Sequence, residues 1–370
     1  MSITRIGYLD KSYNTEMLRI LRSSPITTNK ITLCFDRQPD IFLLAEIKYE
    51  HFSYLGFFIN DKLSGFVLNG YHKALVNGNP ETVFHFTDYY IEPEARGKSF
   101  NFMISEYLFK ETYQNAKLGY AIIMEGNKEA LSLVGRRHSK YPHVPWTRII
   151  NKLEVKTIMI TWPLKLSALY KIRHAEKKDI PVIVSLLSSE QSGRLFGGIF
   201  SESTFESYVT NRTGLTINNY YLAEDKQGSI CGVCAAWDCT SFKQNRVLNY
   251  GSGFLTAKLF FKFLSLIFGF SALPGKGEAF RDINVTDYAV RNRDPQIMNA
   301  LLRAIYIDCR KSGYQSIIWG STAGDSLLTA TQGFFSQSVI SNIVLLSTQP
   351  DLIEENIIQN NLPYIDVACL

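Results

Sequence analysis

The hydrophobic and polar positions of this chain repeat one order of elements in its two halves. Residues 56–67 and 221–234 each read as a strand, a polar turn containing Asp-Lys, and a second strand that carries glycine. Two further pairs of similar segments follow: FTDYYI (86–91) with VTDYAV (285–290), and LGYAIIMEGN (118–127) with SGYQSIIWGS (312–321). Each half therefore predicts a helix, an antiparallel hairpin, a long strand, a helix, a strand, a helix and closing strands.

An amphipathic helix is predicted between the last two segments of each half, because apolar residues recur there at helical spacing. These residues include Phe102, Met103, Tyr107 and Leu108 in the first half, and Met298, Leu301, Leu302 and Ile305 in the second. This order of elements is typical of an α+β fold, in which each half has a mixed, mostly antiparallel sheet flanked by helices. We place the join near residues 161–180, which predicts one domain at 1–162 and a second at 163–370.

Length and composition agree with two folded domains and exclude some classes of protein. A chain of 370 residues corresponds to about two domains. Its 46% hydrophobic and 13% aromatic residues can form an ordinary core, which excludes a disordered chain. The net charge of +5 is spread without long basic runs, so we expect no nucleic-acid partner. The first residues, MSITRIGYLD, contain no apolar secretion signal, which predicts a cytoplasmic protein.

Cys231 and Cys234 have the spacing of a redox or zinc pair, but they lie in a predicted strand. Side chains three positions apart in a strand point to opposite faces of the sheet. We therefore expect buried thiols and no metal site.

The longest apolar run, LFFKFLSLIFGFSAL at 259–273, lies in an insertion of the second half. Lys262 interrupts the run, and the uninterrupted part is shorter than the roughly 20 residues that span a membrane. We therefore expect no transmembrane segment. The interpretations are a buried helix or one that forms a homodimer, and, as the alternative, a helix on a membrane surface.

A basic turn joins a strand to a helix within residues 90–104, YIEPEARGKSFNFMI. The first N–H groups of a helix have no partner inside the helix, and the helix dipole is positive there, so phosphate groups bind at such places. The candidate N–H donors belong to Gly97, Lys98, Ser99, Phe100 and Asn101. Arg96 and Lys98 add positive charge. The alternative is an ordinary helix start with solvated basic side chains.

The order of strand, basic turn, helix and following strand resembles the GNAT superfamily of acyl-CoA-dependent N-acyltransferases. The joint of that family has Arg or Gln, two residues, Gly, one residue, and then Gly or Ala. The matching positions here are Arg96, Gly97, Lys98 and Phe100, with Ile91 and Pro93 at the usual places before them. Ser99 and Asn101 replace the two small residues. The resemblance covers nearly the whole chain as two copies and is strongest over residues 55–135.

The resemblance implies that the pyrophosphate of coenzyme A binds at this joint. It implies further that the pantetheine arm pairs with the backbone around Tyr90 and Ile91, and that Asn127 corresponds to the asparagine that follows the next strand of the family. The thioester of an acyl-CoA, which we expect to be acetyl-CoA, would then point into a cleft.

The second copy departs further from the family at its joint, which reads VRNRDPQIMNALL and has no glycine. Tyr120 follows Asp88 after 32 residues, whereas Tyr314 follows Asp287 after only 27. The Asp-Pro pair at 294 and 295 is typical of a helix cap and first helical residue, and its carboxylate would compete with a phosphate. We therefore expect coenzyme A to bind only in the first half.

The strand TVFHFTDYY is where the resemblance implies a catalytic base. By alternation, His85, Thr87, Tyr89 and Ile91 share one face, and Asp88 and Tyr90 share the other. A β-bulge, which the family strand often has, would exchange the two faces beyond it.

The catalytic candidates are His85, Asp88 and Tyr120. His85 has the intrinsic pKa best suited to a base, and the alternative for it is a packed sheet histidine. Asp88 recurs in the second copy as Asp287, which favours a structural role. The tyrosine that serves as the family's acid falls at Val134, so Tyr120 and Tyr141 are the substitutes for it.

These observations predict an acyl-CoA-dependent N-acyltransferase that transfers an acetyl group to a small-molecule or peptide amine. Amine acylation requires a neutral amine, donors for the oxyanion, and an acid for the leaving thiolate. The alternative is a non-catalytic acyl-CoA-binding protein or a structural pseudoenzyme. The missing tyrosine, the replaced glycines and the altered second joint favour that alternative.

Overall fold

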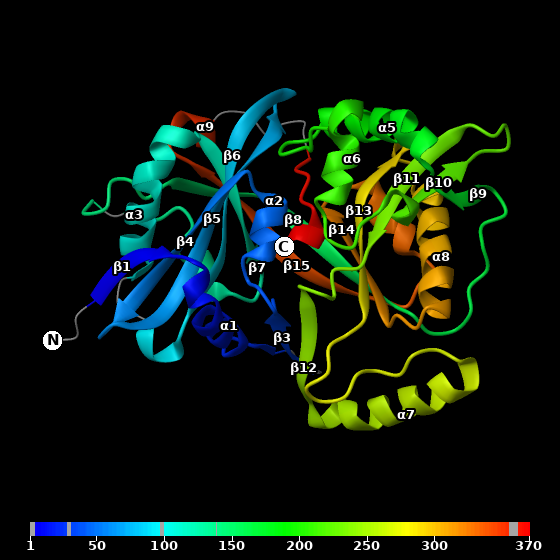
Figure 1. The fold of residues 1–370 in the computed structure, drawn as a ribbon, viewed down its shortest axis with the longest axis horizontal. Helices are drawn as coiled ribbons and strands as arrows, with labels where there is room; N and C mark the ends of the chain where they lie inside the picture. Colours follow the sequence, from blue (N-terminus) through cyan, green and yellow to red (C-terminus); the bar gives the residue numbers. More distant parts are fainter. Residues whose placement is uncertain (1–3, 28–30, 97–99, 138, 355–361) are drawn as a thin grey trace.

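One twelve-stranded sheet runs through both halves of the molecule (Figure 1). The computed structural model describes residues 4–27, 31–96, 100–137, 139–354 and 362–370. In spatial order the strands are β1 (Thr4–Leu9), β4 (His51–Ile59), β5 (Lys62–Val76), β6 (Asn79–Ile91), β7 (Leu118–Met124), β15 (Ser336–Ser347), β8 (Trp146–Met159), β14 (Ser316–Thr322), β13 (Asp282–Val290), β11 (Ile230–Trp237), β10 (Tyr220–Glu224) and β9 (Lys171–His174). Among the strands of the described residues only β6–β7 and β13–β14 pair in parallel, which confirms the predicted mixed, mostly antiparallel sheet.

The two halves exchange their closing strands at the centre of this sheet. Strand β15, from the second half, pairs along its whole length with β8 and over residues 341–347 with β7. Strand β8, from the first half, pairs in turn with β14 of the second. A cut of the chain at residue 162 would therefore leave each half without one of its neighbouring strands. The division into domains at 1–162 and 163–370 stays a prediction, because both parts contribute to one sheet.

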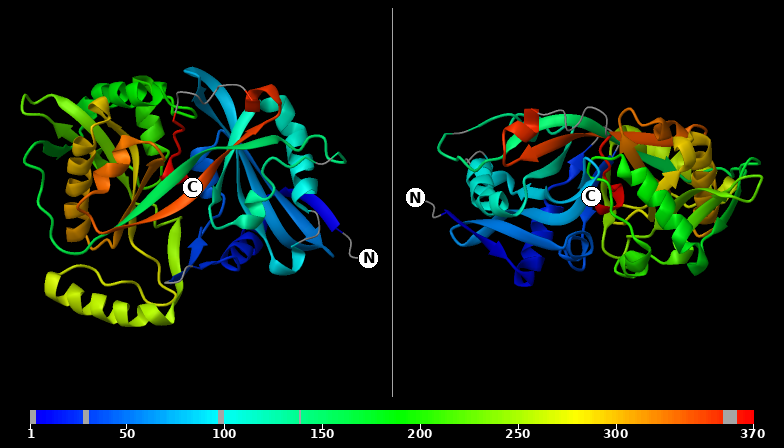
Figure 2. Two further views of the ribbon diagram at one scale, coloured as in Figure 1. Left: turned by 180° about the vertical axis from the view of Figure 1, so that it is seen from behind. Right: turned by 90° about the horizontal axis from the view of Figure 1, so that it is seen from above.

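Helices cover both faces of the sheet in each half (Figures 1 and 2). The helices are α1 (Asn14–Arg22), α2 (Leu43–Lys48), α3 (Phe100–Asn115), α4 (Lys128–Leu131), α5 (Ile180–Ser192), α6 (Glu202–Thr210), α7 (Ser252–Phe268), α8 (Pro295–Lys311) and α9 (Asp351–Glu354). Short 3₁₀ turns are η1 (Lys11–Tyr13), η2 (Pro93–Ala95), η3 (Lys177–Asp179), η4 (Ile217–Asn219), η5 (Arg291–Arg293), η6 (Ser326–Thr331) and η7 (Val367–Cys369). Helices α1 and α2 pack on one face of the first half and α3 on the other, while α5 and α6 lie opposite α8 in the second.

The predicted apolar face is complete in α8 but shifted in α3. Met298, Leu301, Leu302 and Ile305 of α8 are all buried. Among the α3 residues whose side chains are described, the buried apolar ones are Ile104, Leu108 and Phe109, whereas Tyr107 is 44% exposed and packs on Tyr8 of the edge strand. Asp294 caps α8 by accepting a bond from the N–H of Gln296, with Pro295 as the first helical residue, as the sequence predicts.

A second, three-stranded sheet connects the halves and leads into α7. Its strands are β2 (Ile26–Thr27), β3 (Ile31–Asp36) and β12 (Gln244–Tyr250), in the order β12-β3-β2. Helix α7 follows β12 and contains most of the long apolar run. The expectation that this helix is buried is wrong, because Leu259, Phe263 and Leu266 are 69%, 59% and 78% exposed. No helix within the described ranges is long and apolar enough to cross a membrane.

All six cysteines are free and buried, which confirms buried thiols in place of a redox pair. The expectation that Cys231 and Cys234 face opposite sides is wrong: both lie in the core between the sheet and α8. The cause is a bulge in β11, where Ala223 pairs with Gly232 but Glu224 pairs with Ile230, so that Cys231 is the extra residue.

Candidate active site

The sheet opens between β6 and β7 in the first half. The two strands pair at Val83–Leu118, Phe84–Gly119 and His85–Tyr120, and share no further pair among the described residues. Beyond this point β6 stays paired with β5, and β7 with β15. The separation leaves two strand edges that diverge inside the sheet, where an extended ligand can bind to the backbone.

A β-bulge in β6 lies just beyond the start of this opening. Asp88 has a φ of +49°, and the pairing with β5 shifts by one residue between Phe66 and Leu68. Asn and Asp tolerate such left-handed conformations better than most residues. The bulge brings Asp88 to the face that His85 and Thr87 occupy, so the exchange of faces anticipated from the sequence does take place. Tyr89 and Ile91 consequently pack toward α3, and Tyr90 packs on the opposite face.

A small pocket of about 10 Å³, with room for little more than one water molecule, lies on this face of the bulge. Its charged side chains are Arg37, Lys48 and Asp88, and Thr87, Tyr49 and the chain around Cys369 complete the polar part of the wall. The Nη2 of Arg37 is 3.7 Å from Oδ1 of Asp88. The hydroxyl of Tyr54 donates to Oδ2 of Asp88 over 3.4 Å. The carboxylate of Asp88 therefore has two long polar contacts and lies in the wall of the pocket.

Lys48 is the group in this pocket that titrates near neutral pH. Burial at the end of α2 lowers the pKa of its ammonium to about 8, although nearby acidic groups oppose the shift. The Nζ atom donates to the carbonyl of Cys369 over 3.0 Å and lies 2.9 Å from Nδ1 of His85. Sequence analysis missed Lys48, because a lysine in the last turn of a short helix is an ordinary surface residue.

His85 is fully buried next to Lys48 and does not line the pocket. The hydroxyl of Tyr49 lies 2.6 Å from its Nδ1, and its ring stacks on Tyr120 with centroids 4.3 Å apart. Burial, with a smaller contribution from the charge of Lys48, lowers the pKa of His85 well below its ordinary value. His85 is therefore a neutral imidazole whose Nδ1 faces Lys48, and Nε2 is buried without a hydrogen-bond partner.

Tyr120 and Asn127 occupy structural positions around the opening. Tyr120 stacks between His85 and Phe196, and burial raises the pKa of its hydroxyl. Asn127 caps α4 by accepting a bond from the N–H of Ala130 over 3.1 Å. Tyr90 packs against Phe66 with ring centroids 5.5 Å apart.

The basic joint begins where β6 ends. Arg96 is exposed directly after the η2 turn, and α3 begins at Phe100. Gly97, Lys98 and Ser99 lie outside the described residues, so the predicted N–H donors stay a prediction. The described part places a basic residue and a helix start at the end of the strand that borders the opening, which is the position that phosphate binding requires.

The second half contains the same opening in the same register. Strands β13 and β14 pair at 282–316, 283–317 and 284–318 and then separate. Asp287 has a φ of +47° at an equivalent bulge. Its carboxylate accepts bonds from Tyr208 over 2.6 Å and from Tyr220 over 2.7 Å, and Arg212 lies 3.7 Å away. Asp287 is thus held more tightly than Asp88.

The chain's own residues 362–370 fill the second opening (Figure 1). Tyr364 packs in the core with Tyr288 of β13, with ring centroids 5.8 Å apart. Val367 packs so closely on β14 that a Cβ on Gly320 would lie 3.0 Å from its side chain. Lys243 donates to the carbonyls of Val367 and Ala368 over 3.1 and 3.0 Å. A ligand in this opening would have to displace a packed segment.

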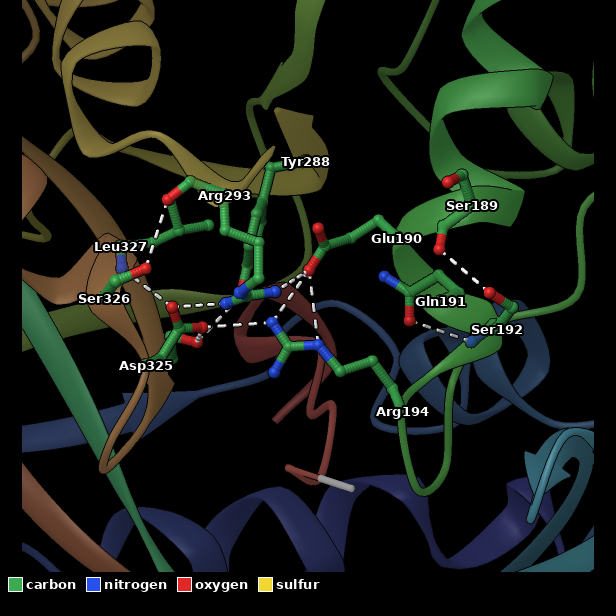
Figure 3. Close-up of polar contacts among 12 residues, drawn as sticks. Ser189, Glu190, Gln191, Ser192, Arg194, Tyr288, Arg293, Asp325, Ser326 and Leu327 are labelled. Atoms are coloured by element: carbon green, nitrogen blue, oxygen red, sulfur yellow. Dashed lines mark hydrogen bonds and ion pairs between the residues drawn. The ribbon is translucent and has the colours of Figure 1, made fainter. Parts of the chain in front are cut away.

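A buried group of four charges closes the end of the second opening (Figure 3). Arg194 donates to Glu190 over 2.8 Å and to Asp325 over 3.1 Å. Arg293, in the turn that precedes α8, pairs with the same two carboxylates. Burial raises the pKa of Asp325, but bonds from Arg293 and Ser321 outweigh it, so the pKa stays below its usual value. The two carboxylates therefore balance the charge of the two arginines, which disfavours a phosphate at this place.

This sheet, with two openings that each have a bulge just beyond their start, has the fold of solved N-acyltransferases. A Saccharomyces cerevisiae N-myristoyltransferase with bound myristoyl-CoA aligns with a TM-score of 0.62 at 11% identity, over 99% of this chain and 85% of that one. A GCN5-related N-acetyltransferase from Sphaerobacter thermophilus aligns with a TM-score of 0.51 at 12% identity, over 80% and 81%.

A probable N-acyltransferase of Enterococcus faecalis V583 aligns with a TM-score of 0.50 at 14% identity, over 94% of this chain and 73% of that one. No protein-family model matches the sequence, and no curated protein sequence matches it. At these identities the likeness concerns the fold.

Proposed function

We propose that the protein transfers an acyl group from acyl-CoA to an amine, with the cofactor in the opening between β6 and β7. One observation carries the proposal: this opening runs from a bulge to a basic helix start and has a pocket with a titratable lysine beside it. The opening of the second half is filled by residues 362–370, and its arginines are paired. One acyl-CoA per chain is the expected stoichiometry.

The reaction follows from the groups around the first opening. The coenzyme A phosphates bind at the joint of Arg96, and the pantetheine arm extends along the edge of β6 near Tyr90 and Ile91. The thioester carbonyl would then lie near the bulge, where the amine would approach Asp88. The amine nitrogen forms a bond to the carbonyl carbon, the C–S bond breaks, and the thiolate leaves. The carboxylate of Asp88 attracts the cationic form of the acceptor.

Neutral Lys48 accepts the first proton of the cationic amine, and the proton that the nitrogen loses after the attack would go to the leaving thiolate. A base with a pKa of about 8 is half deprotonated at about pH 8, which is close enough to physiological pH to suit general base catalysis. His85, as a neutral acceptor 2.9 Å from Nζ, positions Lys48 and acts through it. The direct use of His85 as base, and of Tyr120 as acid, are the competing assignments, and both would require a buried side chain to reach the substrate.

Thermal unfolding and thiol release test this proposal together. Coenzyme A and acetyl-CoA should each raise the Tm, because a ligand that binds only the folded chain stabilises it. With acetyl-CoA and a panel of small amines and peptides, free thiol should accumulate. The same assay with myristoyl-CoA tests which acyl chain length the protein transfers. Calorimetry should give one site per chain. The absence of any stabilisation by coenzyme A would overturn the proposal.

A non-catalytic acyl-CoA-binding protein is the second candidate function. The complete burial of His85 and Tyr120 favours it, since neither side chain can contact a substrate as the chain is folded. This candidate predicts the same rise in Tm and the same stoichiometry, but no thiol release with any amine. The two assays therefore separate the two functions.

A further inference from the structure

Helix α7 presents an apolar face to solvent. Leu259, Phe260, Phe263, Leu266, Ile267 and Phe268 are between 43% and 78% exposed. Leu259, Phe263, Leu266 and Ile267 are spaced by four, three and one residues, so they share one side of the helix. In the described part of the chain no other element exposes as many large apolar side chains. Apolar surface gathered in this way marks an interaction site.

The helix is fixed to the body of the protein on its other side. Phe261 packs edge-on against Phe270 with ring centroids 5.0 Å apart, and Ser265 is buried. Arg310 of α8 donates to the carbonyls of Phe268 and Thr161. The hydroxyl of Tyr250 donates to the carbonyl of Pro274 over 2.8 Å. The exposed face therefore belongs to an anchored helix at one edge of the molecule (Figures 1 and 2).

A second exposed aromatic pair adjoins the end of α7. Trp162 follows Thr161 in the chain. Arg310 donates hydrogen bonds to the carbonyls of both Thr161 and Phe268, the last residue of α7. Trp162 and Phe335 are each 46% exposed, and their ring centroids are 6.3 Å apart. Tryptophan favours the boundary between apolar and aqueous phases, because its ring is apolar and its N–H is polar.

The charge of this region is positive. Residues 251–281 contain Lys258, Lys262, Lys276 and Arg281 against the single carboxylate of Glu278, which gives 4 − 1 = +3 of the chain's net +5. Helix α7 itself has two lysines and no acidic residue. Lysines at the border of an apolar helix face attract anionic lipid headgroups while the apolar side chains enter the bilayer.

We propose that α7 is a membrane-docking helix that lies in the plane of an anionic phospholipid surface. The apolar face enters the headgroup boundary, and Lys258 and Lys262 contact phosphate and carboxylate groups of the lipids. A second copy of this chain fits the face less well. One side of a 17-residue helix covers on the order of 250 Å², against about 800 Å² per partner in stable interfaces. A symmetric contact would also bring like-charged lysines together.

Vesicle sedimentation with the full chain tests this proposal, which does not depend on acyl transfer. Vesicles of phosphatidylcholine with phosphatidylserine should bind the protein at least about fivefold more tightly than phosphatidylcholine alone, and added salt should reduce the difference. The double change Phe263→Ser and Leu266→Ser should weaken binding to both vesicles by about tenfold or more. Lys262→Glu should weaken binding to the anionic vesicles only.

Matched variants keep the test decisive. Ile149→Ser removes an apolar side chain that is 45% exposed on β8, and it should leave vesicle binding unchanged. Phe263→Trp preserves the apolar face, and its fluorescence should shift to the blue and be quenched by brominated lipids. The proposal is overturned if the double change and Ile149→Ser bind alike. It is also overturned if the lipid-free wild type sediments as a dimer that the double change converts to a monomer.

Discussion

The two openings in the sheet have nearly the same backbone and different contents. In both, parallel strands pair for three residues and then separate, and an aspartate at φ near +50° forms a bulge beside them. The first aspartate, Asp88, lines a pocket with Lys48. The second, Asp287, is bound by two tyrosines and an arginine under a packed chain segment. Within the described residues, residues 362–370 pack into the second opening, whereas only their last two residues, Cys369 and Leu370, reach the wall of the pocket at the first.

The comparison also shows why the halves cannot be tested apart. Strand β8 of the first half pairs with β14 of the second, and β15 of the second half pairs with β7 of the first. A separated half would therefore expose the unpaired edges of long strands. Variants in the full chain are the appropriate test of the difference between the two openings.

The largest effect is expected from Lys48→Met, which removes the titratable group of the first opening. General base catalysis contributes about 10²- to 10⁴-fold, so kcat should fall by that factor, while coenzyme A affinity should stay nearly the same. Below a pH of about 8 the wild-type lysine is protonated and cannot accept a proton, so the rate should rise with pH through this value. The variant should lack that limb. A retained limb near pH 8 would remove Lys48 from the mechanism.

The paired changes Asp287→Asn and Asp88→Asn contrast the two bulges directly. Asparagine fits the left-handed backbone, so each change removes a charge without backbone strain. Asp287→Asn should lower the free energy of unfolding by about 3 kcal/mol, because it breaks a buried pair with Arg212 and disturbs two short tyrosine bonds. Asp88→Asn breaks a similar pair with Arg37 but only one long tyrosine bond, so it should cost about 1 kcal/mol less than Asp287→Asn and reduce turnover as well. Equal losses of stability, measured by urea unfolding, would contradict the contrast.

His85→Gln examines how the buried histidine acts. Glutamine retains an acceptor for Lys48 but cannot titrate, so in the positioning role kcat should fall by about tenfold and the pH limb near 8 should persist. If His85 were itself the base, the acidic limb would flatten. If it is only packed in the sheet, stability, binding and turnover should decline together, which thermal unfolding of the same sample reveals.

The sequence carried the local features of this fold, and contacts between distant segments supplied the rest. Asp294–Pro295 as a helix start and the apolar face of α8 follow from neighbouring residues. The exchange of β8 and β15 depends on pairing across more than 150 residues, and the return of residues 362–370 into the second opening depends on contacts such as the one between Lys243 and Val367, 124 residues apart; periodicity gives no signal for either. The pairing of Lys48 with His85 likewise arises from a helix that ends beside a strand, and no spacing in the sequence marks it.

The smallest effect concerns the joint of the first opening, where Ser99 and Asn101 replace the small residues that the resemblance leads us to expect. If these side chains crowd the phosphate site, the double change Ser99→Gly and Asn101→Gly should tighten coenzyme A binding by about fivefold, which corresponds to about 1 kcal/mol of relieved strain. Glycine permits backbone angles and a close approach that the larger residues resist. The control is the same calorimetric titration with Asn292→Gly. Asn292 lies in the corresponding turn of the second half and has a positive φ of 56°. That change should not alter the affinity or the stoichiometry, because Arg293 and Arg194 are already paired with Glu190 and Asp325. Weaker binding after the first double change would instead mean that Ser99 and Asn101 donate to the phosphates themselves, and the first opening would then hold its ligand through side chains where the family uses its backbone.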